Sequence, residues 1–228
     1  MIQTIANALG DLRNDVVFVG GATTAFYIDD PGSPNPTPSD DVDFVIEIAS
    51  QQEYAQLENT LRKKGFKDPT DNDIEHPICR KIYQGIQVDV MPTDAKILGF
   101  ANKWYADAIK NKVRVTLPDG LIAHIFNVTY FLATKLEAFS ARGKPFDIRT
   151  SQDLEDILAV LDGCSQIESD LINSEPKVRQ FIQSEFKALL KDDAILEEAA
   201  HGFIRASGDP VLRAKKIVSR MRTIANKK

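Results

Sequence analysis

The spacing of hydrophobic and polar positions changes near residue 126. Before it, short apolar runs and two-residue alternation predict strands; after it, apolar residues recur every three or four positions, which predicts helices. Strands are predicted at 16–19, 41–48, 79–83, 86–91, 112–117 and 121–125. Helices are predicted at 1–12, 22–28, 50–64, 127–142, 151–162, 166–173, 176–191, 193–206 and 209–225. This order favours an α+β fold, with a mixed sheet flanked by helices in residues 1–126 and an α-helical bundle in residues 127–228.

Capping and turn residues refine these elements. Ser50 with Glu53 three positions later is a helix-start signal, and Gly65 ends the same helix. Gln84-Gly85 forms the turn of a predicted hairpin. Four prolines exclude helix and central strand from loop 29–39. The loop is long enough to be a flap over a site, and it fits a disordered excursion as well.

The strand that begins at Asp41 carries two carboxylates on one face. Side chains alternate along a strand, so Val42 and Phe44 face the core while Asp41 and Asp43 point together to the other side. Two like charges this close are unfavourable unless a cation lies between them. The pair predicts a site for a hard cation such as Mg²⁺, which takes oxygen ligands. Two solvated side chains on an edge strand are the alternative.

The strand at 86–91 repeats this pattern with a single carboxylate. Val88 and Val90 form the core face and leave Asp89 on the opposite face, although strands are depleted in Asp. If this strand lies beside the Asp41 strand, three carboxylates converge. Such a set can bind two metal ions that clamp an in-line displacement, and Asp89 can accept the proton of an attacking hydroxyl.

A glycine pair follows the first strand. Val16 to Val19 reads as a strand buried on both faces, and Gly20-Gly21 permits a tight turn with close approach of a ligand. The start of a following helix favours an anion, to which Thr23 or Thr24 can add a hydroxyl. An ordinary turn is the alternative, because neither a Walker loop nor a GxGxxG motif is present.

Composition limits the class of protein. The 228 residues have 43% hydrophobic and 27% charged side chains and a formal net charge of −5, which is ordinary for a globular protein. No apolar run reaches the length of a membrane span, and no secretory signal is evident. Two cysteines, Cys79 and Cys164, are too few for a disulfide framework, which favours a cytoplasmic location.

The last eighteen residues are basic and contain no acid. Apolar residues at helical spacing predict that this stretch docks on the body and shows its charge outward, where it can hold nucleic-acid phosphates. Compensation of the helix dipole explains the same charges without a ligand. The basic residues are Arg213, Lys215, Lys216, Arg220, Arg222, Lys227 and Lys228.

Gly20-Gly21, then Asp41-x-Asp43, then a lone Asp89 on a later strand resembles the DNA polymerase β-type nucleotidyltransferase superfamily. Residues 134–143 and 151–157 are similar to the third and fourth motifs of its AbiEii/AbiGii toxin-like branch. The resemblance covers roughly residues 16–160, in four short blocks. The chain departs from the pattern in having Gly-Gly-Ala-Thr for the usual Gly-Ser. It also has Gln87 where a lysine is often found two residues before the third carboxylate.

The resemblance implies a metal-dependent enzyme that transfers a nucleoside monophosphate from an NTP, with Mg²⁺ or Mn²⁺ as cofactor. Asp41, Asp43 and Asp89 would ligate metal. The nucleotide would be held by Gly20, Gly21, Thr23, Lys135 and Arg142, with Asp153 supporting the pocket or catalysis. Taken without the resemblance, Lys135 and Arg142 fit a solvated helix face, and Asp153 and Asp156 fit dipole compensation.

The expected acceptor is RNA such as tRNA, within a toxin–antitoxin or phage-defence system that could include a cognate antitoxin. AMP transfer to a protein and nucleotide transfer to an antibiotic remain open within the same class. A catalytically silent nucleotide-binding module on the same scaffold is the alternative from another class.

Overall fold

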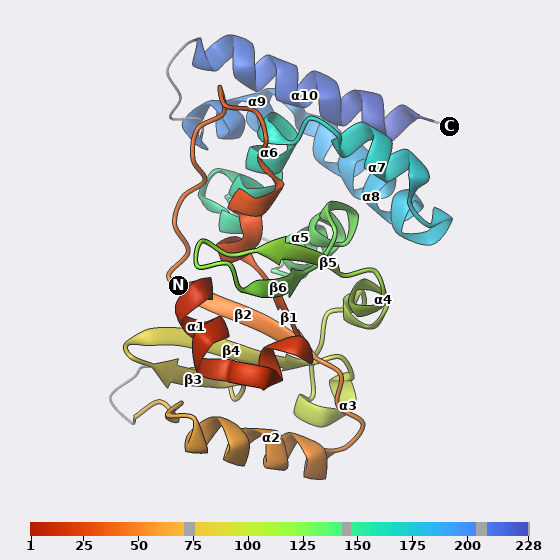
Figure 1. Cartoon of the computed structure of the whole chain (residues 1–228). Coiled ribbons are helices and arrows are strands. Elements are labelled where there is room, and N and C mark those ends of the chain that lie inside the picture. Colours follow the sequence, from red (N-terminus) through yellow and green to blue (C-terminus); the bar gives the residue numbers. More distant parts are fainter. Residues whose placement is uncertain (71–75, 143–146, 204–208, 228) are drawn as a thin grey trace. The chain divides into compact units, whose positions relative to one another are not determined.

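The computed structural model describes residues 1–70, 76–142, 147–203 and 209–227 (Figure 1). Two compact units make up the chain. The first unit contains residues 1–23 and 38–127, and the second contains residues 24–37 and 128–228. The sequence-based boundary after residue 126 had assigned residues 24–37 to the first part, whereas the structure groups them with the helices of the second.

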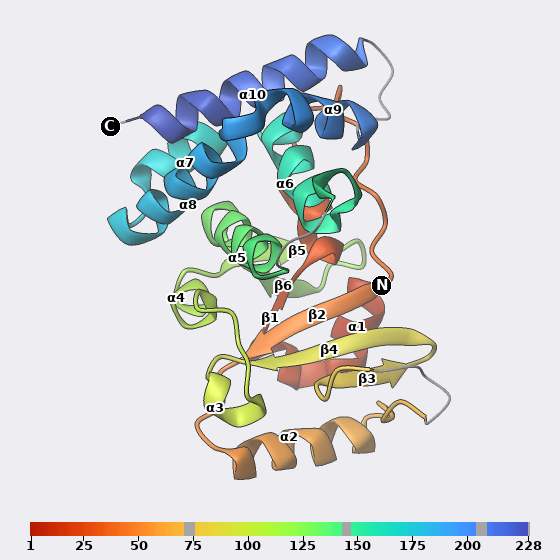
Figure 2. The same cartoon turned by 180° about the vertical axis from the view of Figure 1, so that it is seen from behind.

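A six-stranded mixed sheet forms the centre of the first unit, in the order β3-β4-β2-β1-β6-β5 (Figure 2). Its strands are β1 (Val16–Val19), β2 (Asp41–Ile46), β3 (Arg80–Tyr83), β4 (Ile86–Pro92), β5 (Val113–Thr116) and β6 (Ile122–Ile125). The β2–β4 and β1–β6 pairs are parallel, and the other pairs are antiparallel. The predicted α+β class with a mixed sheet and flanking helices is confirmed.

Burial along the strands follows the predicted alternation. Val42, Phe44, Val88 and Val90 are fully buried, and all of β1 is buried. The helix α1 (Ile2–Leu9) covers one face of the sheet, as Figure 1 and Figure 2 show from opposite sides. A 3₁₀ helix, η1 (Gly10–Asn14), connects α1 to the region before β1. Two short helices that the sequence did not predict follow β4, namely α3 (Ala95–Leu98) and α4 (Tyr105–Lys110).

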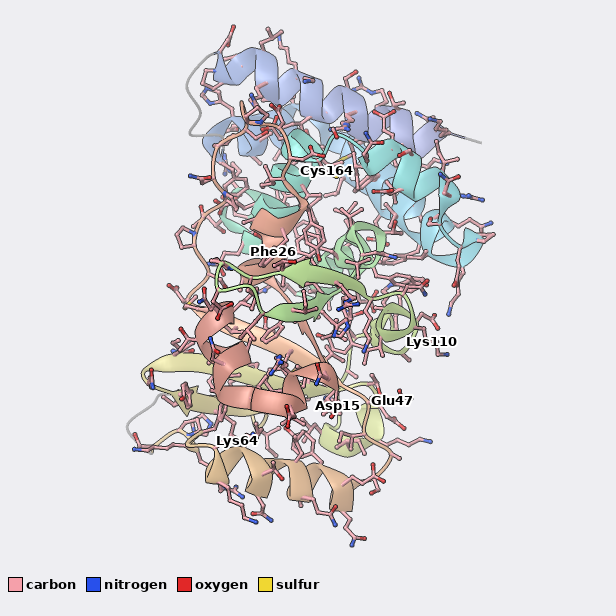
Figure 3. The ribbon with its side chains drawn as sticks, in the orientation of Figure 1. Asp15, Phe26, Glu47, Lys64, Lys110 and Cys164 are labelled. Atoms are coloured by element: carbon pink, nitrogen blue, oxygen red, sulfur yellow. The ribbon has the colours of Figure 1, made fainter. Side chains whose placement is uncertain are left out.

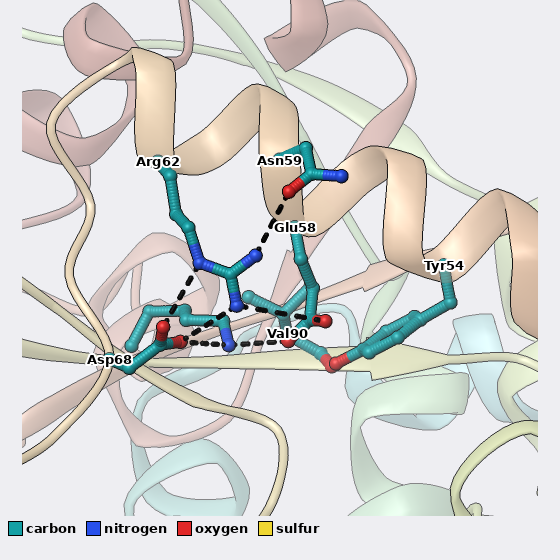
Figure 4. A network of polar contacts seen from close by, with 7 residues as sticks. Tyr54, Glu58, Asn59, Arg62, Asp68 and Val90 are labelled. Atoms are coloured by element: carbon teal, nitrogen blue, oxygen red, sulfur yellow. Dashed lines mark hydrogen bonds and ion pairs between the residues drawn. The ribbon is translucent and has the colours of Figure 1, made fainter.

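Ser50 is the N-cap of helix α2 (Gln51–Lys63), as predicted, and its side chain accepts a hydrogen bond from the Glu53 amide. An ion-paired network links this helix to the sheet (Figure 4). Lys81 of β3, almost fully buried, contacts Glu58 at 2.5 Å and Asp68 at 2.7 Å, and the Tyr54 hydroxyl donates to the Val90 carbonyl. Lys81 is paired with Val88 in register, so the two side chains lie on the same face of β3 and β4. Because Glu58 of α2 contacts Lys81, α2 covers that face.

The second unit is helical. The predicted helix at 193–206 is observed to residue 203, and residues 204–206 lie outside the described part of the chain. The predicted α-helix at 22–28 is instead the 3₁₀ helix η2 (Gly21–Tyr27). The helical elements from residue 128 onward are α5 (Val128–Ala141), η3 (Ile148–Thr150), α6 (Gln152–Gly163), α7 (Ile167–Asn173), α8 (Pro176–Leu189), η4 (Leu190–Asp192), α9 (Asp193–Phe203) and α10 (Pro210–Asn226).

Residues 24–37, here called the inserted segment, pack on these helices. The amides of Asp29 and Asp30 both donate to the carbonyl of Gly163, at 3.0 Å each. A Cβ at Gly163 would lie 2.7 Å from a methyl carbon of Ile28, so a larger residue here would require the Ile28 side chain to shift. The Asp29 carboxylate accepts bonds from the Ser165 amide and hydroxyl. The proline-rich loop is therefore held along much of its length.

The end of α6 continues this packing. Figure 3 labels Cys164 there and Phe26 on the inserted segment. Cys164 is buried and unpaired with another cysteine, as is Cys79 of the first unit, so no disulfide is present among the described residues. Within the same residues, no helix combines the length and apolar character needed to cross a bilayer.

Candidate metal centre

Three carboxylates converge on one face of the first unit's sheet. Asp41 and Asp43 come from β2, and Asp89 comes from its parallel neighbour β4, where it stands directly beside Asp43 in register. One oxygen atom of each lies within 4.8 Å of the others. The sequence predicted this convergence on the condition that the two strands are neighbours. In the structure β2 and β4 are neighbours, and the three carboxylates converge.

The turn after β1 is built around the same carboxylates. Gly20 has a positive φ of 76°. A Cβ at this position would lie 2.1 Å from Oδ2 of Asp43. Gly20 is therefore required both for the backbone conformation and for the space that the Asp43 carboxylate occupies. The glycine contributes to the position of the acidic cluster, a role that the sequence did not indicate.

Thr23 makes a contact different from the one expected. Its hydroxyl donates to the Gly20 carbonyl at 2.8 Å, and its side chain is fully buried. The hydroxyl thus closes the turn in this structure. The Ser39 hydroxyl lies closer to the carboxylates, because it donates to Asp41 at 2.9 Å.

Arg80 is the residue at this site that the sequence reasoning missed. Its Nε and Nη2 atoms bind the two oxygens of Asp89 at 2.8 Å each, and Nη2 also lies 3.5 Å from Asp41. The Nη1 atom donates to Gln87 at 2.5 Å. Gln87 is the acceptor of this bond on β4, and the positive charge beside it comes from Arg80 on the neighbouring strand β3.

The signal for Arg80 was present in the hairpin. A two-residue turn at Gln84-Gly85 fixes the register, so that Arg80 faces Asp89 across β3 and β4. Asp89 raises the pKa of Arg80, mainly through their hydrogen bonds. Burial raises the pKa of the adjacent Cys79 thiol to about 12, with a smaller contribution from the negative charge of Asp89. This thiol stays protonated at neutral pH.

The donor set fits a hard divalent cation. Carboxylate oxygens are the ligands that Mg²⁺ and Mn²⁺ prefer. The side chains of Asp89 and Asp41 are 13% and 32% exposed, so the site is accessible to an ion and is partly shielded from water. Asp41, Asp43 and Asp89 could hold such an ion, and Arg80 shows that the cluster accommodates positive charge.

Lys135, Arg142 and Asp153 form a cluster within the second unit. Lys135 of α5 lies 2.6 Å from Asp156 and 3.2 Å from Asp153, both on α6. Arg142, two helical turns after Lys135, binds Asp153 at 2.8 Å. The Thr24 hydroxyl of the inserted segment donates to Asp156 at 3.0 Å. The lysine and both carboxylates are largely buried, so these charges neutralise one another.

The basic residues of α10 are partly engaged in similar contacts. Arg213 binds the buried Asp162 and also contacts Asp30 and Ser33. Arg220 pairs with Glu168, and Arg222 pairs with Asp193. Lys215 and Lys216 are exposed, whereas Lys228 lies outside the described residues. The expected outward basic face is therefore reduced to lysines, because the three arginines bind carboxylates of their own unit.

Comparison of the chain with protein-family models gave no match, and comparison with curated proteins gave none.

Proposed function

We propose that the protein is a metal-dependent nucleotidyltransferase that transfers a nucleoside monophosphate from an NTP to an acceptor hydroxyl, with release of pyrophosphate. The observation that carries this proposal is the convergence of Asp41, Asp43 and Asp89 within 4.8 Å, beside a glycine turn that leaves room for Asp43. A bound Mg²⁺ or Mn²⁺ would neutralise charge that develops on the transferred phosphoryl group. The three carboxylates would hold the ion, and Asp89 would accept the proton of the acceptor hydroxyl.

For the acceptor, RNA such as tRNA is the class that we favour, in a toxin–antitoxin or phage-defence setting. The exposed Lys215 and Lys216 of α10 offer positive charge for phosphates, on a helix whose arginines are held in place by ion pairs. A cognate antitoxin belongs to the same proposal. Protein AMPylation and antibiotic modification use the same chemistry at the metal centre and differ only in the acceptor.

A second candidate, a catalytically silent nucleotide-binding module, is favoured by one observation. Arg80 donates a hydrogen bond to each oxygen of Asp89. In a silent module, this ion pair would be permanent and would replace the metal. In that case the purified protein would bind no divalent ion at the triad.

The experiment compares the wild type with Asp43→Asn and with the matched control Asp40→Asn, an exposed neighbour. Each protein is incubated with each α-³²P-labelled NTP, with Mg²⁺ or Mn²⁺, and with total RNA or total protein. We expect transfer by the wild type and Asp40→Asn, and a loss of at least about 100-fold in Asp43→Asn, since even outer partners of metal ligands cost 10–100-fold. Equal activity in Asp43→Asn would refute the assignment.

A further inference from the structure

The contacts of Arg80 suggest a role beyond an ordinary ion pair. Its guanidinium binds Asp89 through two parallel hydrogen bonds and approaches Asp41 at 3.5 Å, so it spans two of the three carboxylates that form the triad. Bidentate binding of this kind is the strongest arrangement between Arg and a carboxylate. Both oxygens of Asp89 therefore face positive charge already.

A divalent ion at the triad and the guanidinium would compete for the same carboxylates. The ligand oxygens lie within 4.8 Å of one another, and one Asp89 oxygen is needed for the set. An ion bound there would place two positive charges next to the positive charge of the Arg80 guanidinium. Because like charges at such distances repel strongly in a partly buried site, the arrangement of Arg80 has to change when the ion binds.

The surroundings allow Arg80 to move. The Arg80 side chain is 20% exposed, and besides the two bonds to Asp89 it donates to the exposed Gln87 and approaches Asp41. By contrast, Lys81 on the other face of β3 is 3% exposed and is held between Glu58 and Asp68. A displaced guanidinium would remain beside the triad as an unpaired positive charge, and polyphosphate is a ligand that matches its fork of N–H donors.

We propose that Arg80 is a built-in counter-cation of the triad, which a divalent ion displaces from Asp89 and Asp41, so that the guanidinium reaches the polyphosphate of the nucleotide only after the ion has bound. The inference rests on the proposed function and deepens it, because it makes metal and nucleotide binding sequential. Arg80 is thus a positioning residue in the metal-free protein and a nucleotide contact in the loaded one.

The first test measures Mn²⁺ binding to the full chain by calorimetry, for the wild type, Arg80→Gln, Arg80→Lys and Arg62→Gln. Arg62 is the matched control because it also binds a carboxylate, Asp68, through Nε and Nη2, on helix α2. We expect Arg80→Gln to bind Mn²⁺ about tenfold more tightly, since a charge at this distance changes ion equilibria by that order or more. Arg80→Lys should lie nearer to the wild type, and Arg62→Gln should match it.

Thermal unfolding with and without Mn²⁺ provides a readout that a purely structural role would not give. Metal-free Arg80→Gln should be less stable than the wild type because its carboxylates repel, and Mn²⁺ should raise its midpoint by more than that of the wild type. Weaker or unchanged Mn²⁺ affinity in a folded Arg80→Gln protein would overturn the inference.

The second test measures binding of the α,β-methylene analogues of the four nucleoside triphosphates at saturating Mn²⁺. For whichever analogue the wild type binds, we expect about tenfold weaker binding by Arg80→Gln, as for loss of one charged hydrogen-bond partner. Unchanged binding would refute the polyphosphate contact. If Asp43→Asn binds Mn²⁺ as well as the wild type does, the proposed function fails. If Asp43→Asn loses Mn²⁺ binding while the Arg80 variants bind Mn²⁺ and the nucleotide analogue as the wild type does, the inference alone fails.

Discussion

Gly20 and Asp43 meet so closely that a Cβ atom on the glycine would lie 2.1 Å from the carboxylate oxygen Oδ2. Gly20 directly follows β1, and Asp43 belongs to β2, where it is paired in register with Val19, the last residue of β1. The glycine therefore sets the position of a candidate metal ligand as well as the path of the chain.

Gly20→Ala should displace Asp43 and weaken Mn²⁺ binding at least about tenfold, as for loss of support to a metal ligand. The positive φ should add a loss of about 1–2 kcal/mol in the free energy of unfolding. Gly99→Ala is the control, because Gly99 has a φ of 86° and nothing lies within 4 Å of its Cβ position. Calorimetry and urea unfolding separate the two effects. If both variants bind Mn²⁺ equally well, the contact with Asp43 has no consequence for the site.

Lys135→Met should destabilise the protein by about 3–5 kcal/mol, because the substitution leaves the largely buried Asp156 without its cation and leaves Asp153 paired only with the exposed Arg142. Lys187→Met on the exposed side of α8 should change stability little. Chemical denaturation of the two variants gives the comparison. A Lys135→Met protein of undiminished stability that no longer binds nucleotide would instead assign Lys135 to the ligand, as the family resemblance implies.

The stability contributed by Lys135 should depend on alkaline pH. Burial lowers the pKa of this lysine, but attraction by Asp156 and then Asp153 outweighs burial and raises the pKa above its ordinary 10.5. A raised pKa in the folded state means that the stabilisation is complete below the unfolded-state value and is lost as the pH rises through the folded-state value. As the pH rises above about 10.5, the free energy of unfolding should fall more steeply in the wild type than in Lys135→Met. Parallel curves would contradict the assignment.

Gly163→Ala should loosen the inserted segment. The added Cβ would lie 2.7 Å from Ile28 and 2.9 Å from the Ser33 hydroxyl. We expect a loss of about 1–3 kcal/mol in the free energy of unfolding, as in other overpacked sites. Gly202→Ala in α9 is the control, since nothing lies within 4 Å of its Cβ position, and it should gain about 0.5–1 kcal/mol from helix propensity. Thermal and urea unfolding give the sign of each change.

Lys215→Gln combined with Lys216→Gln should weaken RNA binding and reduce its dependence on salt, because each phosphate contact releases a counterion. The substitutions keep α10, whose apolar side is buried in the second unit, so they are preferable to deleting the helix. Lys187→Gln with Lys191→Gln removes the same charge from another exposed region. Fluorescence anisotropy over a salt series distinguishes the pairs; equal effects would indicate only non-specific attraction.

The candidate metal centre could be predicted from sequence because strand alternation fixes the face of each side chain. Asp41 and Asp43 had to share a face, and Asp89 had to oppose Val88 and Val90 in the same way. Arg80 required one further step, the register of the hairpin across Gln84-Gly85. That step depends on the length of the turn, which the sequence did indicate.

Other features depend on packing that no local pattern expresses. Helices α3 and α4 are too short to show a helical period. The membership of residues 24–37 in the second unit follows from Gly163 and Ser165, which lie more than a hundred residues later. The ion pairs of Lys135 depend on the packing of α5 beside α6. The sequence pattern of α5 alone is the same for a solvated lysine and for a lysine paired with another helix.

The inserted segment limits the positions at which the gene for this protein can be divided between the two units. The polypeptide passes from one unit to the other after residues 23, 37 and 127. A gene fragment that ends near residue 127 would encode β1 and β2 joined by a stretch that has lost the helices on which it rests. Recombination at a single junction therefore would not exchange the whole helical unit, because residues 24–37 would stay with the first part.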